Sequence, residues 1–197
     1  MSSPLSNSRT PEVDIDPMFT DRWSPRSFAP EPLSDEELQS LFEAARWAPS
    51  CYNEQPWLFI YAVSEGDRQR FATALVEQNR LWASRAPVLL FVVARLEFAR
   101  NGKANRHGIF DAGAAWMSLA LQARKRGLYA HAMAGFSVER AHEVLAVPRQ
   151  GYEIMAAVAI GRRDDPALLP APVAANEAPN GRRPLVDVAF AGRFPAD

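Results

Sequence analysis

This chain of 197 residues has one cysteine, three histidines and a net charge close to zero, so several markers of function are missing. Cys51 alone cannot form an intrachain disulfide, which fits a reducing compartment, and we therefore expect a cytoplasmic protein. No apolar run reaches the roughly 20 residues that a membrane-spanning helix needs. The formal charge of −1 favours neither nucleic acid nor an anionic membrane as a partner.

Common catalytic motifs are missing as well. The histidines at positions 107, 131 and 142 lie far apart, without H-E-x-x-H or C-x-x-C spacing, so the sequence predicts no metal site. It contains no G-x-G-x-x-G or G-x-S-x-G, and residues 108–113 have the glycine spacing of a phosphate loop without its Lys and Ser/Thr. We expect Cys51 to be a small loop residue rather than a nucleophile.

A basic segment near the N-terminus is the first positive indication of function: Arg22-Trp23-Ser24-Pro25-Arg26-Ser27-Phe28. Pro25 disfavours helical geometry at Ser24, and alternate residues of an extended segment point the same way. Arg22, Ser24 and Arg26 would then present two guanidinium groups and a hydroxyl to one target, which suits a phosphate monoester. The alternative, which this segment alone leaves open, is an arm whose arginines pair with surface carboxylates.

A second polar segment covers residues 49–57, Pro-Ser-Cys-Tyr-Asn-Glu-Gln-Pro-Trp, between a predicted helix and a predicted strand. The carboxamides of Asn53 and Gln55 each offer a donor beside an acceptor, which suits the edge of a heteroaromatic ring. The alternative is an ordinary helix-to-strand turn, in which Pro, Ser and Asn are favoured for local reasons.

The hydrophobic pattern predicts an α+β fold. Ser34 and Glu37 form a capping box for a helix that ends before Pro49, and Ser64 starts a helix expected to reach about Gln78. Further expected elements are strands at 57–63, 87–94, 128–133 and 153–160, and helices at 108–126 and after Ser137. Because residues 87–94 are apolar throughout, helices must cover both faces of a central mixed sheet of four or five strands.

Two parts of the sequence indicate an assembly. Residues 112–123 are apolar on nearly every face, which predicts a buried helix, and in so short a chain a subunit interface buries it most easily. Residues 164–184 hold five prolines and open an arm, 164–197, that is expected to cross a neighbouring subunit; the alternative is a mobile tail. Residues 1–17 are expected to be a disordered or extended leader, and 18–197 one domain.

Taken together, the motifs resemble the nitroreductase family, which binds flavin mononucleotide (FMN). R-x-S-x-R-x-F is followed by P-S-x-x-N-x-Q-P-W, then by Met133-Ala134-Gly135-Phe136, and finally by residues 180–185, Asn-Gly-Arg-Arg-Pro-Leu. The resemblance runs from about Phe19 to Arg193. It implies a nitroreductase-like fold and a homodimer that exchanges C-terminal arms and holds FMN at the subunit interface.

The resemblance also implies a role for each matching residue. The implied cofactor-binding residues are Arg22, Trp23, Ser24, Arg26, Ser50, Cys51, Asn53, Gln55, Asn79, Met133, Ala134, Gly135, Arg182 and Arg183. The arginines and Ser24 match phosphate and ribityl contacts, and Trp23 replaces a residue that is usually basic. Residues 50–55 match the loop that reaches FMN from the other subunit. Residues 133–135, with Asn79, match the ring contacts, and Asn180 stands where a second basic residue is common.

The activity implied is that of an FMN-dependent NAD(P)H oxidoreductase, which reduces nitroaromatics, quinones or similar small-molecule acceptors by a ping-pong mechanism. No catalytic side chain is expected, because the protein contributes positioning and electrostatics to the flavin. Two alternatives stay open: another flavin chemistry on the same fold, such as reductive dehalogenation or flavin cleavage, and a flavin-binding sensor or store without turnover. We also expect the polar loop 97–107 to be mobile and to border the acceptor pocket; the alternative is a plain solvent loop.

Overall fold

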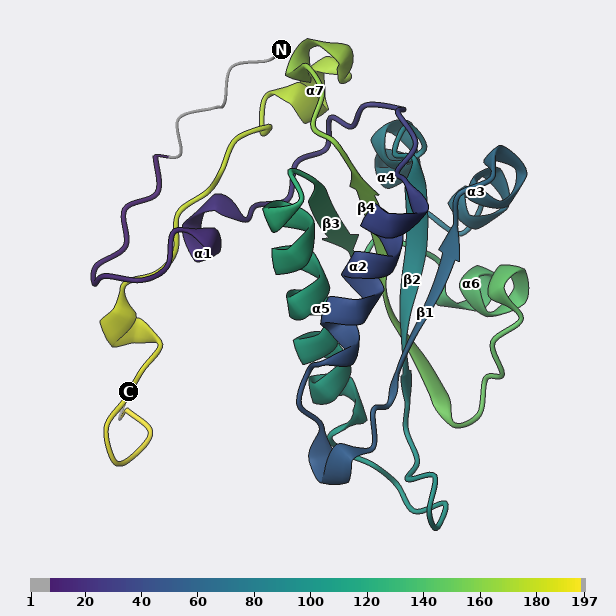
Figure 1. Ribbon diagram of the computed structural model, residues 1–197, viewed down its shortest axis with the longest axis vertical. Helices are drawn as coiled ribbons and strands as arrows, with labels where there is room; N and C mark the ends of the chain where they lie inside the picture. The colour runs from purple at the N-terminus through teal and green to yellow at the C-terminus, as the bar shows by residue number, and fades with distance from the viewer. Residues whose placement is uncertain (1–7, 196–197) are drawn as a thin grey trace.

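A computed structural model of the protein describes residues 8–195, and residues 1–7 of the predicted leader lie outside the described part (Figure 1). In chain order the elements are α1 (Met18–Asp21), α2 (Asp35–Arg46), β1 (Trp57–Ala62), α3 (Glu65–Ala72), α4 (Glu77–Ala83), β2 (Val88–Arg95), α5 (Gly108–Lys125), β3 (Tyr129–Met133), α6 (Val138–Leu145), β4 (Tyr152–Gly161) and α7 (Ala171–Ala174). Short 3₁₀ turns occupy Cys51–Asn53, Pro166–Leu168 and Leu185–Asp187.

The central sheet has four strands in the order β1-β2-β4-β3, and every neighbouring pair is antiparallel. The α+β class is confirmed, but the prediction of a mixed sheet is wrong. Strands β2 and β3 run in the same direction because α5 returns the chain between them, yet β4 lies between these two strands and is antiparallel to both. The alternation of helices and strands in the sequence did not reveal this insertion, because β4 comes last in the chain.

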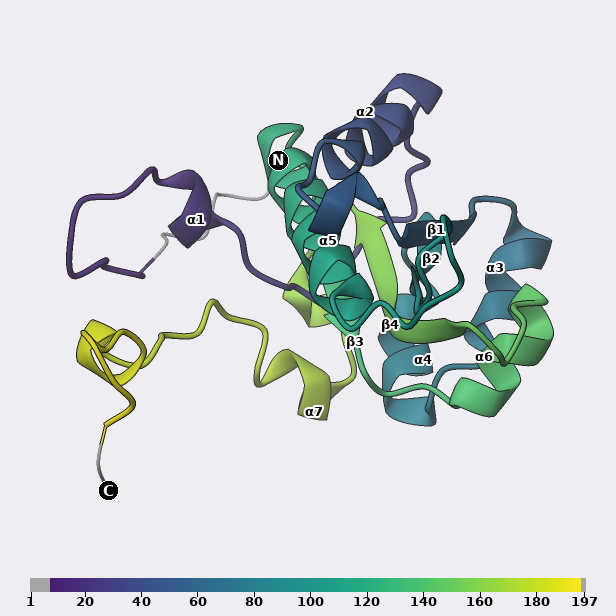
Figure 2. The same cartoon turned by 90° about the horizontal axis from the view of Figure 1, so that it is seen from below.

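Helices cover both faces of the sheet, as the continuous apolar run of β2 required. Leu89, Phe91 and Val93 face α3, α4 and α6 in one buried cluster. Leu90 and Val92 face α2 and α5 in the other. This alternation is the two-residue period of a strand, here apolar on both sides. Figure 2 shows the sheet between its two helical layers.

The predicted helix starts are confirmed. The hydroxyl of Ser34 accepts the N–H of Glu37, whose carboxylate accepts the N–H of Ser34 in return. The hydroxyls of Ser64 and Ser137 cap α3 and α6 by accepting the N–H groups of Asp67 and Arg140, without the return bond.

The predicted end of the second helix near Gln78 is wrong, because α3 stops at Ala72 and a separate helix, α4, begins at Glu77. Leu75 forms an isolated antiparallel bridge with Phe136, and the N–H of Val76 donates to the carbonyl oxygen of Gly135 at 3.1 Å. The segment after β3 therefore interrupts the helix, although the apolar spacing of Phe71 and Leu75 continues the helical pattern.

The long helix α5 is buried on one side only within the single chain. Ala112, Ala115 and Leu119 pack against α2 and the sheet. Elsewhere on the helix, Phe110 is 77% exposed and Ile109 is 45% exposed. The sequence predicted a helix that is buried on all sides. The chain's own elements bury only one side of it.

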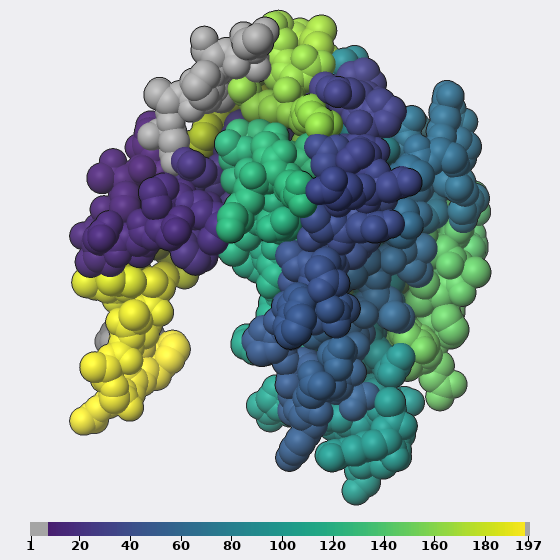
Figure 3. Space-filling model, viewed as in Figure 1, coloured from purple at the N-terminus to yellow at the C-terminus, as the bar shows by residue number. Residues whose placement is uncertain are grey.

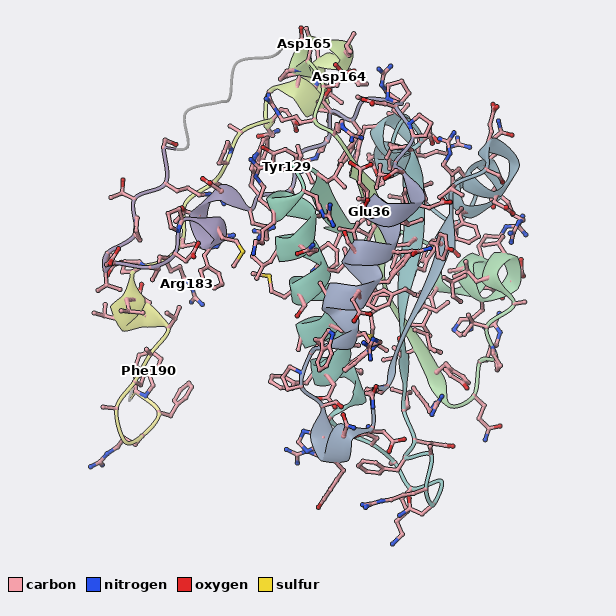
Figure 4. All side chains as sticks on the ribbon, viewed as in Figure 1. Glu36, Tyr129, Asp164, Asp165, Arg183 and Phe190 are labelled. Carbon is pink, nitrogen blue, oxygen red and sulfur yellow. The ribbon has the colours of Figure 1, made fainter. Side chains whose placement is uncertain are left out.

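The two ends of the described chain leave the body together. Residues 8–17 run beside the C-terminal arm, and Figure 3 shows this N-terminal segment, in purple, in contact with the arm, in yellow. Arg183 and Phe190 project from the arm well away from the sheet (Figure 4). Along the arm Val186, Val188 and Phe194 are exposed. The exchange of this arm between subunits stays a prediction.

Candidate functional site

The basic segment leads from α1 towards the sheet and is anchored by Phe28, which is fully buried and bridges to Arg163. Arg22 and Ser24 lie on the same side, with Nη1 of Arg22 3.5 Å from the hydroxyl of Ser24. The guanidinium of Arg26 reaches the carbonyl oxygen of Asn176, on the C-terminal arm, at 3.4 Å. Arg22 and Ser24, two positions apart in this extended segment, therefore lie on one side, as the alternation predicted.

A buried carboxylate that sequence reasoning missed fixes the backbone of this segment. Glu177, 6% exposed, accepts the N–H of Arg26 with both oxygens at 2.9 Å and the N–H of Ser27 at 3.0 Å. It lies about 150 positions away, in the Pro-rich arm, where no pattern identifies it. Because the two amides share one carboxylate, the basic segment and the arm form a single unit.

Arginines from both ends of the chain gather beside the basic segment. Burial lowers the pKa of Arg22, and the positive charge of Arg182 lowers it further. Burial also lowers the pKa of Arg9, with Arg182 and Arg22 adding to the effect. We call Arg9, Arg22 and Arg182 the arginine cluster. Mutual repulsion of this kind favours an anion at the cluster. Arg9 was not expected from the sequence, because it lies outside the basic motif.

The side chain of Trp23 is not available for binding at the surface. Only 6% of it is exposed, its ring packs edge-on against Tyr129 at 6.0 Å between centroids, and the guanidinium of Arg163 lies 5.7 Å from its centre. Trp23 therefore belongs to the core, and contact with a ligand here would have to come from its backbone.

The segment at the end of β3 meets α4. Nδ2 of Asn79 donates to the carbonyl oxygen of Gly135 at 3.0 Å. Met133 is buried, whereas Ala134 is exposed at the edge of the sheet. The N–H groups of Ala134 and Gly135 find no backbone or side-chain acceptor within residues 8–195. Two exposed-edge amide donors beside a carboxamide can bind the polar edge of a planar ring.

The loop 49–57 has a strained backbone. Tyr52, Asn53 and Gln55 all have positive φ, between 51° and 57°, a region that residues with a side chain rarely adopt. Among the hydrogen bonds that hold this conformation, two run from the backbone to side chains. The N–H of Cys51 donates to Oδ2 of buried Asp111 on α5 at 3.0 Å, and the N–H of Gln55 donates to the hydroxyl of Ser50 at 3.0 Å. Strain of this kind is typical of ligand-binding loops.

The loop 97–107 packs on the strained loop. The N–H of Ala99 donates to Oε1 of Glu54 at 2.5 Å, and the guanidinium of Arg100 lies 4.5 Å from the ring centre of Tyr52. A bridge between Glu97 and Ala104 closes the loop on itself. The sequence predicted little to hold this loop down, and that part of the prediction is wrong, because the anchoring contacts come from residues more than 40 positions away.

Two groups of the predicted residues lie at opposite ends of α5, whereas Asn79 and residues 133–135 lie at α4 and after β3. The strained loop is bonded to Asp111 in the first turn of the helix, whereas Trp23 packs on Tyr129 just after its last turn. An 18-residue helix is about 27 Å long. A single mononucleotide cannot contact both groups of one chain, so the loop and the arginine cluster can share a ligand only if a second copy supplies one of them.

His131 lies behind the basic segment and gives a pH-dependent stability. Its Nδ1 is 2.8 Å from the carbonyl oxygen of Pro25. Burial, reinforced by repulsion from Arg26 and Arg22, lowers its pKa from 6.5 to about 4. The folded protein therefore keeps His131 neutral at pH values where the unfolded chain protonates it.

We expect this histidine to contribute stability that is fully present above pH 6.5 and is lost as the pH falls to about 4. The loss should approach about 1.4 kcal/mol per pH unit within that range. Urea unfolding of the wild type and of His131→Asn between pH 7 and pH 4 measures it. Equal slopes for the two proteins would rule out this role for His131.

No group of three or more His, Cys, Asp or Glu side chains that could hold a metal ion occurs in residues 8–195. Within the same range, none of the helices has the length and hydropathy required to cross a bilayer.

Comparisons with known proteins by sequence and by structure agree with each other. The sequence profile of the nitroreductase family matches residues 19–83 and 74–162. A solved structure described as an oxidoreductase containing FMN is 45% identical, covers 98% of this chain and 100% of its own, and superposes with a TM-score of 0.92.

Two relatives match over shorter segments. A putative NADH dehydrogenase/NAD(P)H nitroreductase of Streptomyces coelicolor is 38% identical over 36% of each chain. Nitrobenzene nitroreductase of Ectopseudomonas oleovorans is 39% identical over 34% of this chain and 29% of its own length. Only about a third of each of these two relatives is therefore matched. The arm that carries Glu177 and Arg182 lies beyond the region matched by the family profile.

Proposed function

Because this chain belongs to the nitroreductase family, we propose that it is an FMN-dependent oxidoreductase that reduces nitroaromatics, quinones or similar acceptors with NAD(P)H. The observation that carries the proposal is the arginine cluster, in which Arg9 is hydrogen-bonded both to the basic segment and to the C-terminal arm. It is supported by the similarity over nearly the full length to an oxidoreductase that contains FMN.

The arginine cluster suits the terminal phosphate of a mononucleotide. Arg22 and Arg182 offer permanently charged donors, Ser24 adds a hydroxyl beside Arg22, and Arg26 and Arg183 lie on the same two segments. The chain has no dinucleotide fingerprint, which favours FMN over FAD. The residues present therefore fit a phosphate dianion.

The end of β3 suits the ring of the flavin. Bound FMN would supply the redox chemistry, taking a hydride from the nicotinamide and passing electrons to the acceptor in turn. The N–H groups of Ala134 and Gly135 would donate to the polar edge of the ring, and Asn79 holds this segment in place. Donors fixed in this way stabilise negative charge without reorganisation. The protein's contribution is thus positional, and no side chain is assigned an acid or base role.

A homodimer would complete the site, with Ser50, Cys51, Asn53 and Gln55 contributed by the second copy. The distance between the two groups of residues within one chain supports this arrangement. The exposed side of α5, around Phe110, and the exposed apolar residues of the arm would be buried by such a partner. An interface of this kind buries well over about 2,000 Å².

Steady-state oxidation of NADH and NADPH, with a quinone and with a nitroaromatic compound as acceptor, tests the proposed activity. We expect turnover with at least one acceptor for the wild type, and loss of turnover together with FMN for Arg22→Ala. Arg149→Ala, which removes an exposed arginine paired with Glu139 on the surface, serves as the matched control. A protein that holds FMN but oxidises neither nucleotide with any acceptor would be a flavin-binding protein without turnover, and the proposed activity would be wrong.

The loop 97–107 should affect substrate affinity rather than FMN binding. The guanidinium of Arg100 lies over the ring of Tyr52 in the strained loop. Lys103, three positions further along the chain, is exposed. We expect the double change Arg100→Glu and Lys103→Glu to raise the KM for NADPH several-fold, by about 1 kcal/mol of lost attraction, with an unchanged Kd for FMN. Arg149→Glu is the control for a change of charge elsewhere. Unchanged KM values for both nucleotides and several acceptors would exclude this loop from the site.

A further inference from the structure

The N-terminal segment is bonded to the C-terminal arm at two places. Nε of Arg9 donates to the carbonyl oxygen of Asn180 at 2.7 Å, and Nη2 of Arg9 donates to Oδ1 of Asn180 at 3.0 Å. Three residues further on, Oε1 of Glu12 accepts the N–H of Leu185 at 3.0 Å. Figure 3 shows the two segments in contact over this length. They also line one cavity of about 750 Å³, with Arg9, Arg182 and Arg183 in its wall.

We propose that Arg9 belongs to the phosphate-binding site, as a third guanidinium beside Arg22 and Arg182 that also holds these two arginines in place. The inference rests on the proposed function, because the anion is taken to be the phosphate of FMN. It adds to that function a segment of the chain, residues 8–12, that neither the motifs nor the region matched by the family profile includes.

The geometry of Arg9 gives it a positioning role. Besides its bonds to Asn180, its Nη1 donates to the carbonyl oxygen of Arg22 at 2.8 Å and to that of Thr20 at 3.1 Å. One guanidinium therefore ties Arg22, the first residue of the basic segment, to Asn180, two positions before Arg182. Planar guanidinium groups hold several acceptors in a fixed arrangement, which a flexible ammonium group cannot do as well.

The charge of Arg9 gives it a direct role as well. Arg182 and Arg22 are near enough for their positive charges to lower its pKa, so the three groups repel one another. Arg9 is tied to the backbone of Arg22 and to the carboxamide of Asn180 by hydrogen bonds to uncharged acceptors. A phosphate dianion at the cluster would relieve this repulsion. Each of the three arginines would therefore strengthen the binding of the phosphate.

The test compares a ligand with the phosphate and one without it. The apoprotein of the wild type, Arg9→Gln, Arg9→Lys and the surface control Arg149→Gln is titrated with FMN and with riboflavin. For Arg9→Gln we expect FMN affinity to fall about tenfold, as for a lost hydrogen bond to a charged group, while riboflavin affinity changes less than about twofold. Arg9→Lys should keep part of the preference for FMN, and Arg149→Gln all of it. Added salt should weaken FMN binding less in Arg9→Gln than in the wild type.

Each other outcome has a definite meaning. If Arg9→Gln keeps the wild-type ratio of FMN to riboflavin affinity, or lowers both affinities equally, Arg9 is not part of the phosphate site, and the proposed function stands. If the wild type binds FMN no more tightly than riboflavin, or binds neither, the proposed phosphate site is wrong and this inference fails with it. Thermal unfolding of each variant shows that it is folded, and Arg9→Lys carries the test if Arg9→Gln is not.

Discussion

Replacing Glu177 by alanine should lower the free energy of unfolding by about 3 kcal/mol, because the change leaves buried donors without an acceptor. The carboxylate accepts the N–H groups of Arg26 and Ser27 at 2.9–3.0 Å, and Ser27 is itself buried. With the anchor lost, the basic segment and the arm should separate, and FMN affinity should fall by at least about tenfold. Urea unfolding and FMN titration measure the two effects.

Two controls sharpen this prediction. Glu177→Gln keeps one acceptor oxygen and the shape of the side chain, so it should lose less stability than the alanine variant. Glu143→Ala removes an exposed glutamate whose only described ion pair, with Arg140, is on the surface, and should change stability by less than about 0.5 kcal/mol. A Glu177→Ala protein as stable as the Glu143→Ala protein would show that the buried carboxylate is not an anchor.

Replacing Gly135 by alanine should lower FMN affinity by about 5- to 150-fold, the equivalent of the roughly 1–3 kcal/mol that overpacking costs. A Cβ at this position would lie 2.5 Å from Nδ2 of Asn79 and 2.9 Å from Cγ2 of Val76. Asn79 cannot move away freely, because the same Nδ2 donates to the carbonyl oxygen of Gly135. The segment after β3 would therefore shift, and with it the two amides proposed to face the flavin ring.

A glycine without neighbours provides the control. An added Cβ at Gly66, in α3, meets no atom within 4 Å, so Gly66→Ala should leave FMN affinity unchanged and favour the helix. Asn79→Ala should recover part of the affinity lost in Gly135→Ala by removing the closest clash. If Gly135→Ala binds FMN as tightly as Gly66→Ala does, the segment after β3 is not part of the flavin site.

Features that depend on neighbouring residues were predictable from the sequence. The caps at Ser34, Ser64 and Ser137 need only the residues that follow them within one turn, and all three are present. The burial of β2 follows from its own composition. The break between α3 and α4 was not predictable, because it depends on the contact between Leu75 and Phe136, which are 61 positions apart. The antiparallel insertion of β4 likewise depends on the order in which distant strands pair.

The same distinction applies to the candidate site. The alternation of Arg22 and Ser24 is local, and the structure places both on one side. The residues that hold the site, Glu177 behind Arg26 and Asp111 behind Cys51, are 151 and 60 positions away, and a buried carboxylate has no sequence pattern of its own. Asn180 indicated a phosphate site with one charge fewer than is usual. The structure places the guanidinium of Arg9 on that asparagine, and in our proposal Arg9 supplies the charge that Asn180 lacks.

The most direct test of this account is to identify the cofactor that the purified protein carries. The absorption spectrum of the protein as isolated is recorded, and the small molecule released on denaturation is identified by its mass. We predict the two visible absorption bands of an oxidised flavin and a released molecule with the mass of FMN. A protein that releases FAD, or that stays colourless after incubation with excess FMN and removal of the unbound flavin, would contradict the account.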